Sequence, residues 1–508
     1  MPSPQVLTTA LDFPIATRWL SRSVTGFPGT RRAARNVEES EGGQQDSELK
    51  LPNIVSLCIV LCTSALLQVS FFIIVSSSNE YAQHLGGTST FSGLVIGIPT
   101  VFSGLALIPL MKLDQGVYNR PLHFACGSAV LGHVLYALAY KANFLYMVLV
   151  GRIVSGFAFT FWMYAKRYCS DARIVGIRRR TTLAGWLVLG QGIGFSLGPF
   201  VGGVLYKIGF SNPVFNGFTS PAWIMAGIWT AWWIFTAMFF KDVPIVPPPS
   251  TEFELRPIRV PKNQGIDATD SVSQKEAAET NDPERQRTEV FTVESETVVE
   301  VTQAENSRMS APQWGVTATM CWFAMTCFFI LGAWESNIPV FTGSSSPLSP
   351  FHFSPFAAGN LIALGGACTF PFLFLNVLLA KRYQDRNTLA LGTSLGTAGL
   401  LIALAILSTE TVNYGSLFIC WFLVALGFNL ASTVTLSLLS KQLPAHWNTR
   451  ISLAIQYSNY IGRATGAVWG GAGLKVGMLS YVGTQIAIVG VGVVMFSVLW
   501  RELKAKTG

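Results

Sequence analysis

Long apolar runs alternate with short polar segments along most of this chain. Twelve of the runs are long enough to cross about 30 Å of hydrocarbon as helices, and a helix satisfies its own backbone hydrogen bonds within lipid. The runs are 54–75, 91–111, 121–140, 143–164, 181–206, 222–240, 314–341, 356–380, 388–408, 414–440, 451–474 and 479–500. The pattern predicts an all-α integral membrane protein with twelve transmembrane helices in two six-helix lobes.

A hydrophilic stretch separates the sixth apolar run from the seventh. Residues 241–313 open with a cluster of prolines and continue as Glu, Thr, Ser and Gln with few aromatic side chains. Such a composition cannot bury enough apolar surface to fold, which predicts a disordered cytoplasmic linker. The predicted parts are an N-terminal tail 1–53, an N-terminal lobe 54–240, the linker 241–313, a C-terminal lobe 314–500 and a C-terminal tail 501–508.

Charge is scarce and unevenly placed. Only 12% of the 508 residues are charged, about half the usual share of soluble proteins. Twenty of the 27 acidic residues lie in the N-terminal tail and the linker, so the two lobes cannot present a soluble surface, and a soluble enzyme is excluded for most of the chain. The net charge of +8 comes from Lys and Arg on short loops, as in other membrane proteins. No nucleic acid partner is needed to explain it.

The loop charges also predict an orientation. If the N-terminus is cytoplasmic, the short cytoplasmic loops and the C-terminal tail carry 16 Lys and Arg residues, and the opposite loops carry only Lys141, Lys207 and Lys475. This bias predicts a multi-pass protein with both termini in the cytoplasm. The first 53 residues contain no apolar core of signal-peptide type, so the first span is expected to direct insertion. The basic tail either lies near anionic headgroups or targets an organelle membrane.

An internal repeat relates the two halves. The fifth and eleventh runs carry four glycines each at identical spacing, Gly194, Gly198, Gly202 and Gly203 in one and Gly462, Gly466, Gly470 and Gly471 in the other. Two repeated halves are typical of carriers whose central site alternates between the two sides of the membrane. Small residues four apart let helix backbones approach closely, so we expect these glycines at the interface where the lobes rock. A single pair of this kind can equally mark ordinary helix packing.

The fifth run has a more specific pattern, namely Gly185, Gly194, Gly198, Pro199, Gly202 and Gly203. This spacing resembles the antiporter signature of the major facilitator superfamily. The resemblance implies that fold, a bend at Pro199 that seals the lobe and favours exchange over leak, and proton-coupled antiport of a drug, secondary metabolite or precursor.

Further segments are similar to parts of the same superfamily. Gly151, Arg152 and Gly156 resemble its intramembrane-arginine motif, and Asp114 and Arg120 match two positions of its cytoplasmic latch loop, although the glycine of that loop is displaced. The segment 334–339 and the Gly462-Arg463 pair resemble the lysosomal and vacuolar branch. The resemblance implies loading of an organelle, such as a vacuole or peroxisome, or efflux at the plasma membrane.

Three charged residues lie well inside predicted spans: Arg152, Glu335 and Arg463. A charge at mid-bilayer costs about 2.5 to 3.5 kcal/mol, so such residues usually face a cavity or a partner. Glu335 is the one carboxylate among them and is either a proton carrier or part of a structural ion pair, or else a helix-end residue in water. Arg152 either binds a substrate anion, couples protons or bonds backbone carbonyls. Arg463 has a coupling or a structural role.

The sequence contains no pattern typical of a cofactor site, a metal site or a catalytic site. No phosphate-binding loop of the GxxxxGK[ST] type occurs, the eight cysteines and five histidines show no ligand spacing, and no predicted helix bears paired carboxylates. We therefore expect no cofactor, no metal and no enzyme activity. The predicted partners are a small organic substrate, protons and the bilayer, and the predicted state is a monomer. The alternative is a transport-inactive receptor or scaffold that acts through its linker, and a membrane-embedded enzyme comes third.

Overall fold

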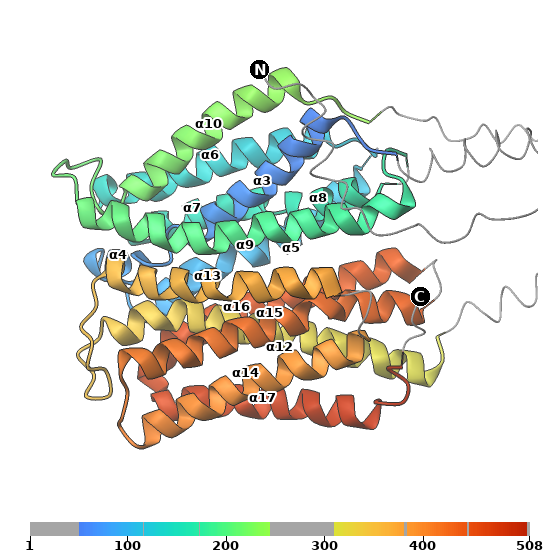
Figure 1. The fold of residues 1–508 in the computed structure, drawn as a ribbon. Coiled ribbons are helices and arrows are strands. Elements are labelled where there is room, and N and C mark those ends of the chain that lie inside the picture. The colour runs from blue at the N-terminus through green and yellow to red at the C-terminus, as the bar shows by residue number, and fades with distance from the viewer. Residues whose placement is uncertain are drawn as a thin grey trace, which may run out of the picture.

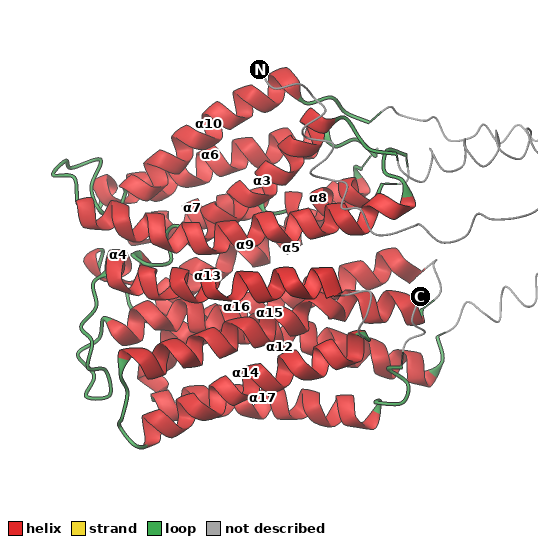
Figure 2. Ribbon diagram, viewed as in Figure 1, coloured by secondary structure: helices red, strands yellow, loops and turns green. Residues whose placement is uncertain are grey.

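The structure is a computed structural model that describes residues 50–114, 116–171, 173–243, 309–379, 384–443 and 447–504. Within these ranges it contains fourteen α-helices and no strand, as Figure 2 shows. Most of the predicted N-terminal tail, most of the linker and the last four residues lie outside the described residues. The prediction of an all-α protein is confirmed for the described chain.

The first half of the chain forms the upper bundle in Figure 1. Its helices are α3 (Ile54–Phe72), α4 (Ser78–His84), α5 (Ser89–Lys112), α6 (Asn119–Ala142), α7 (Leu145–Ala158), α8 (Phe161–Ser170), α9 (Ile177–Ile208) and α10 (Ser220–Phe239). The helices α7 and α8 together form one crossing, which continues beyond the predicted end at residue 164 to Ser170. The short helix α4 was not predicted. We call this bundle the N-lobe.

The second half forms the lower bundle, here called the C-lobe. Its helices are α12 (Ala311–Thr342), α13 (Pro355–Leu379), α14 (Asp385–Ser408), α15 (Tyr414–Gln442), α16 (Asn448–Val476) and α17 (Met478–Val498). The end of the molecule where α10 stops and α12 starts lies on the right in Figure 1 and is called the linker end. The other end is called the opposite end.

Local sequence signals fix several helix boundaries. The side chain of Asn53 accepts hydrogen bonds from the backbone N–H groups of Val55 and Ser56 and so caps α3, which satisfies donors that the first turn leaves free. Asn413 and Ser416 form a capping box at the start of α15. These polar caps place the ends of the apolar helices.

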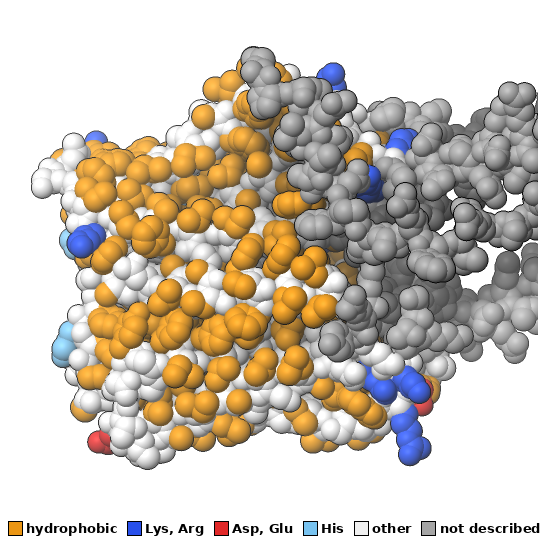
Figure 3. Space-filling view, viewed as in Figure 1, with side chains coloured by type: hydrophobic (Ala, Val, Ile, Leu, Met, Phe, Trp, Pro, Cys, Tyr) orange, Lys and Arg blue, Asp and Glu red, His pale blue; other side chains and the backbone are white. Residues whose placement is uncertain are grey.

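Eleven crossings in the described chain are long and apolar enough to span a membrane. The helix α16 corresponds to the eleventh predicted run and is not among these crossings, since polar residues such as Gln456, Asn459 and Arg463 interrupt its apolar sequence. Exposed Leu105, Leu131 and similar side chains cover the outer surface. In Figure 3 the hydrophobic side chains spread over both lobes, and the charged ones that are drawn lie at the two ends. Such a surface suits hydrocarbon.

The repeated glycines pack mainly inside each lobe. A Cβ added at Gly194 would lie 2.8 Å from the carbonyl oxygen of Ala65 in α3, and one at Gly198 would lie 2.6 Å from the Cβ of Phe72 in α3. In the C-lobe, Gly462, Gly466 and Gly470 approach the backbone of α12 in the same way. The expectation that these glycines form the rocking interface was therefore wrong for the first three of each set. Because glycine has no side chain, two helices of the same lobe can pack closely at these positions.

The fourth glycine of each set does lie between the lobes. A Cβ at Gly203 would lie 3.0 Å from the Cα of Phe356 in α13, and one at Gly471 would lie 3.0 Å from the Cα of Gly93 in α5. Gly185 also faces α13, where a Cβ would lie 3.3 Å from Val377. The lobes thus meet mainly through two helix pairs, α9 with α13 and α5 with α16. The helix α9 continues through Pro199 from Ile177 to Ile208.

Candidate functional site

Two of the three predicted intramembrane charges form an ion pair in the C-lobe. The Nη2 atom of Arg463 in α16 donates to Oε2 of Glu335 in α12 over 2.5 Å. Glu335 is 1% exposed and Arg463 is 8% exposed. The pair can form here because the glycines of α16 let its backbone approach α12, with Gly332 of α12 facing the backbone of Arg463 itself. A buried ion pair satisfies both charges where water cannot.

The guanidinium of Arg463 also reaches the other lobe. Its Cζ atom lies 4.6 Å from the ring centroid of Phe71 and 5.0 Å from that of Phe72, both at the end of α3. Phe328 of its own lobe lies 5.9 Å away. A cation held against aromatic rings is attracted by their electron density. Arg463 therefore links Glu335 in the C-lobe to two rings of the N-lobe.

Arg152, the third predicted charge, has no carboxylate partner among the described ion pairs. It lies on α7, is 1% exposed, and donates from Nε to the carbonyl oxygen of Val95 over 3.2 Å. Its Cζ lies 5.5 Å from the ring centroid of Phe71. Within the described residues its Nη1 and Nη2 atoms have no hydrogen-bond partner. Arg152 and Arg463 thus both lie against the ring of Phe71, whereas Glu335 pairs with Arg463 and not with Arg152.

Two further buried polar side chains lie near Arg152, and sequence reasoning did not select them. His133 and Tyr136 are three residues apart on α6, and Arg152 lies close enough for its charge to interact with both side chains. In the described part of the chain, neither Nε2 of His133 nor the hydroxyl of Tyr136 has a hydrogen-bond partner. Residues three apart share one helix face, which is the signal that could have grouped them.

A polar cavity of about 250 Å³ opens between the lobes at the opposite end. Its polar side chains come from both lobes, and Pro339 and Val340 line it one helical turn beyond Glu335. The polar side chains that line it are Ser76, Asn79, Glu80, Gln83, Ser89 and Ser344. The cavity therefore comes within one helical turn of Glu335, which itself does not line it.

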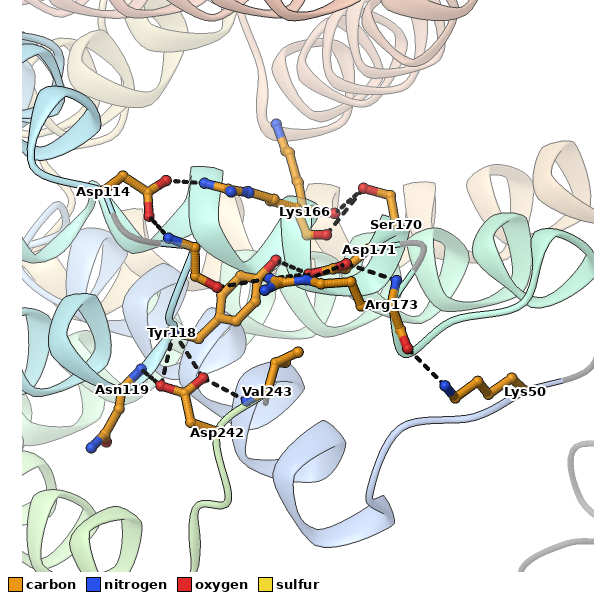
Figure 4. A network of polar contacts seen from close by, with 12 residues as sticks. Lys50, Asp114, Tyr118, Asn119, Lys166, Ser170, Asp171, Arg173, Asp242 and Val243 are labelled. Atoms are coloured by element: carbon orange, nitrogen blue, oxygen red, sulfur yellow. Dashed lines mark hydrogen bonds and ion pairs between the residues drawn. The ribbon is translucent and has the colours of Figure 1, made fainter. Parts of the chain in front are cut away.

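The linker end carries the predicted latch residues (Figure 4). Asp114 forms an ion pair with Arg167 of α8 and accepts the backbone N–H of Gly116 over 2.8 Å. Arg120 is the second residue of α6. Asp114 thus ties the loop after α5 to the end of α8 inside the N-lobe.

A second carboxylate strengthens this network. Asp171 accepts a hydrogen bond from the Tyr118 hydroxyl over 2.8 Å and pairs with Arg173 at 2.6 Å. Burial alone raises the pKa of Asp171, but the hydrogen bonds and charge of Arg173, with the bond from Tyr118, outweigh it, so the pKa of this carboxyl is lowered. Asp242 accepts the backbone N–H groups of Tyr118 and Asn119 and caps α6. The network ties α5, α6, α8 and the end of α10 together.

Contacts between the lobes exist toward both ends. Near the linker end, Nζ of Lys166 donates to Oε1 of Gln456 over 3.2 Å, and Oγ of Ser103 donates to the Tyr460 hydroxyl over 3.0 Å. Toward the opposite end, Nζ of Lys207 lies 4.5 Å from the ring centroid of Phe356. The central charges are therefore enclosed between lobes that touch on both sides of them.

Comparison with known proteins identifies relatives over nearly the whole chain. The Major Facilitator Superfamily matches residues 58–503. An uncharacterised MFS-type transporter of Schizosaccharomyces pombe is 29% identical over 468 residues, which cover 90% of this chain and 84% of that protein. An SPX domain-containing membrane protein of Arabidopsis thaliana is 31% identical over 202 residues, which cover 39% of this chain and 28% of that protein. A crystal structure of the peptide transporter POT shares the fold, with a TM-score of 0.61 at 18% identity, covering 91% of this chain and 99% of that one.

Proposed function

The chain belongs to the major facilitator superfamily, and from this premise we propose that it carries a small organic molecule across a membrane by alternating access, in exchange for protons. Its similarity in fold to a peptide transporter supports a small organic substrate. The two lobes, 54–240 and 314–500, rock about the helix pairs α5 with α16 and α9 with α13.

The Glu335–Arg463 pair is the observation that carries the proton coupling. A proton that binds Glu335 removes its negative charge, so the carboxyl no longer attracts the guanidinium of Arg463 as an ion. Arg463 also contacts Phe71 and Phe72 of the other lobe. Protonation of Glu335 therefore changes the contact that Arg463 makes with the other lobe. Conversely, a movement of the lobes changes the environment of the Glu335 carboxyl.

The cavity at the opposite end supports a route for the proton. It is lined by polar side chains of both lobes and lies one helical turn from Glu335. Water in such a cavity can carry protons to the carboxyl from that side. When the lobes separate at the linker end instead, the same carboxyl faces the other compartment, which is the requirement for coupling by alternating access.

The glycine pattern of α9 supports exchange rather than uniport. Gly185, Gly198 and Pro199 resemble the antiporter signature, and α9 packs against α3 and α13. We propose that drugs, secondary metabolites or their precursors are the substrates, with both termini in the cytoplasm. The transport direction is then efflux at the plasma membrane or loading of an organelle such as a vacuole or peroxisome.

Proteoliposomes with a pH-sensitive dye inside test this function. A metabolite panel, selected by thermal shift of the purified protein, is added to vesicles under an imposed pH gradient. The wild type is expected to move protons when a substrate is present and to concentrate that substrate against its gradient. Glu335→Gln should lose gradient-driven accumulation but keep counterflow exchange, and Glu502→Gln near the C-terminal end is the matched control. A Glu335→Gln protein that still concentrates substrate would remove Glu335 from the mechanism.

A further inference from the structure

Among the buried polar atoms of the N-lobe that lack a hydrogen-bond partner in the described chain, four belong to three neighbouring residues. They are Nη1 and Nη2 of Arg152, Nε2 of His133 and the hydroxyl of Tyr136; Ser76, Ser77, Trp162, Asn216 and Ser220 have one such atom each. The side chains of Arg152, His133 and Tyr136 are 2% exposed or less. A buried polar group without a partner destabilises the protein, and the cost is larger for a charge. A cluster of such groups therefore indicates a ligand.

The C-lobe shows that helix packing does not require these side chains. Gly151 of α7 packs on α6, where an added Cβ would lie 2.8 Å from the carbonyl oxygen of Gly132. Gly427 of α15 packs on α14 in the same way, with an added Cβ 2.6 Å from the carbonyl oxygen of Gly392. The two helix pairs are thus equivalent parts of the repeat.

This equivalence aligns Arg152 and Tyr136 with apolar positions of the other lobe, and it aligns His133 with Thr393, whose hydroxyl also lacks a partner in the described chain. Phe428 follows Gly427 as Arg152 follows Gly151, and Gly396 stands four residues after Gly392 as Tyr136 stands after Gly132. An added Cβ at Gly396 would lie 2.6 Å from the ring of Phe428, so that ring fills the space. Where the C-lobe buries an aromatic ring, the N-lobe buries a guanidinium.

The local charge balance indicates the sign of the ligand. Arg152 and Arg463 both lie against the ring of Phe71, and the one carboxylate of this group, Glu335, is paired with Arg463. Arg152 thus carries an excess positive charge. A guanidinium offers two parallel N–H donors that match a carboxylate or phosphate group, and the Tyr136 hydroxyl can add a third donor.

We propose that Arg152, Tyr136 and His133 bind an oxyanion, which is a carboxylate or phosphate group of the transported molecule. The proposal rests on the proposed transport function and gives it a substrate class. The site lies one helix from the seam between the lobes, because Arg152 bonds to Val95 of α5 and α5 packs on α16. Opening of that seam, with movement of Phe71, exposes Arg152 to the substrate.

Binding of small anions to the purified full-length protein tests the proposal. The probes are sodium phosphate and sodium succinate, with sodium chloride at equal ionic strength and neutral succinamide as controls, and the measurement is the concentration-dependent melting temperature. At least one oxyanion is expected to raise the melting temperature of the wild type in a saturable way, and the two controls should not. The oxyanion that acts distinguishes a carboxylate from a phosphate substrate.

Variants then locate the anion. Arg152→Gln should weaken the affinity at least about tenfold, Arg152→Lys should restore part of it, and Tyr136→Phe should weaken it about threefold. Tyr481→Phe is the matched control, because Tyr481 also has a buried hydroxyl without a described partner but lies in the C-lobe. If Arg152→Gln does not fold, the other two variants still decide the question.

Two results overturn the proposal. One is a wild-type protein that neither oxyanion stabilises, and the other is equal stabilisation of the wild type, Arg152→Lys and Tyr136→Phe, which means that water fills the site. Failure of the transport function is distinguishable from both, since anion binding would persist while proton-driven flux is absent. Conversely, proton-driven flux of substrates without any anionic group refutes the anion site alone.

Discussion

Replacing Glu335 with Gln removes the negative charge that pairs with Arg463 while it keeps the size of the side chain. Both partners are buried, with side-chain exposures of 1% for Glu335 and 10% for Arg463. The guanidinium cannot reach bulk water in this state, because the rings of Phe71 and Phe72 lie against it. The substitution therefore leaves a buried charge without its counter-ion.

The size of the effect follows from these contacts. Removing one partner of a buried ion pair costs about 3 to 5 kcal/mol. Contacts between a desolvated cation and aromatic rings offset about 2 kcal/mol of this cost, so we expect Glu335→Gln to lower the free energy of unfolding by about 1 to 3 kcal/mol. The double variant Glu335→Gln with Arg463→Met removes both charges and keeps an apolar stem against the rings. It should lie within about 1 kcal/mol of the wild type.

A double-mutant cycle measures this coupling. Unfolding in mixed micelles, followed by tryptophan fluorescence, is compared for the wild type, Glu335→Gln, Arg463→Met and the double variant. We expect a coupling energy of about 2 kcal/mol or more between the two positions, and Arg501→Gln, an exposed change, should alter stability by less than about 0.5 kcal/mol. Additive effects of the two substitutions, within about 0.5 kcal/mol, refute the reasoning because uncoupled residues add in this way.

Two further predictions concern packing and pH. Gly198→Ala places a Cβ 2.6 Å from the Cβ of Phe72 and should destabilise the protein by about 1 to 3 kcal/mol. Gly227→Ala is the control and should not destabilise it, because no atom lies within 4 Å of the added Cβ. Equal melting temperatures of the two variants would contradict this prediction. The lowered pKa of Asp171 means that its contribution to stability is present above its ordinary value of 3.8 and is lost as the pH falls through the folded value. The stability difference between the wild type and Asp171→Asn should therefore shrink on acidification from neutral pH, and a constant difference contradicts the assignment.

The membrane-spanning helices could be predicted because the signal is local. Hydropathy and length alone identify a span, since the bilayer fixes the required length. The boundary of α8 was missed because its last part contains Lys166 and Arg167 and ends at Ser170, beyond the apolar run. Hydropathy cannot follow a helix once it leaves the hydrocarbon. The short helix α4 was not predicted for a related reason, because its seven residues are too few to show a helical period of apolar positions.

The candidate site could be predicted only in its parts. The sequence identified Arg152, Glu335 and Arg463 one by one, because each interrupts an apolar run. It did not show that Glu335 pairs with Arg463 and not with Arg152, since that depends on α16 lying against α12. The role of the glycines in holding those two helices together was visible only once their neighbours were known. Long-range pairing is a property of the packed lobes.

Comparison of corresponding positions in the two lobes shows which side chains the packing of a lobe requires. Gly202 approaches the carbonyl of Ile73 as Gly470 approaches that of Ala333, so α3 and the turn after it correspond in register to α12. In this register Val75, in the turn after α3, corresponds to Glu335.

In the same register Phe195 follows Gly194 as Arg463 follows Gly462. Phe195 packs against Phe72 with ring centroids 4.7 Å apart, so at this position the N-lobe joins the corresponding two helices with aromatic side chains and no ion pair. The packing of the C-lobe therefore does not require the ion pair, although each charge adds a cost of about 2.5 to 3.5 kcal/mol in a membrane. The two charges lie where the lobes meet and the fold does not require them, which supports the proposal that the pair couples protons to transport.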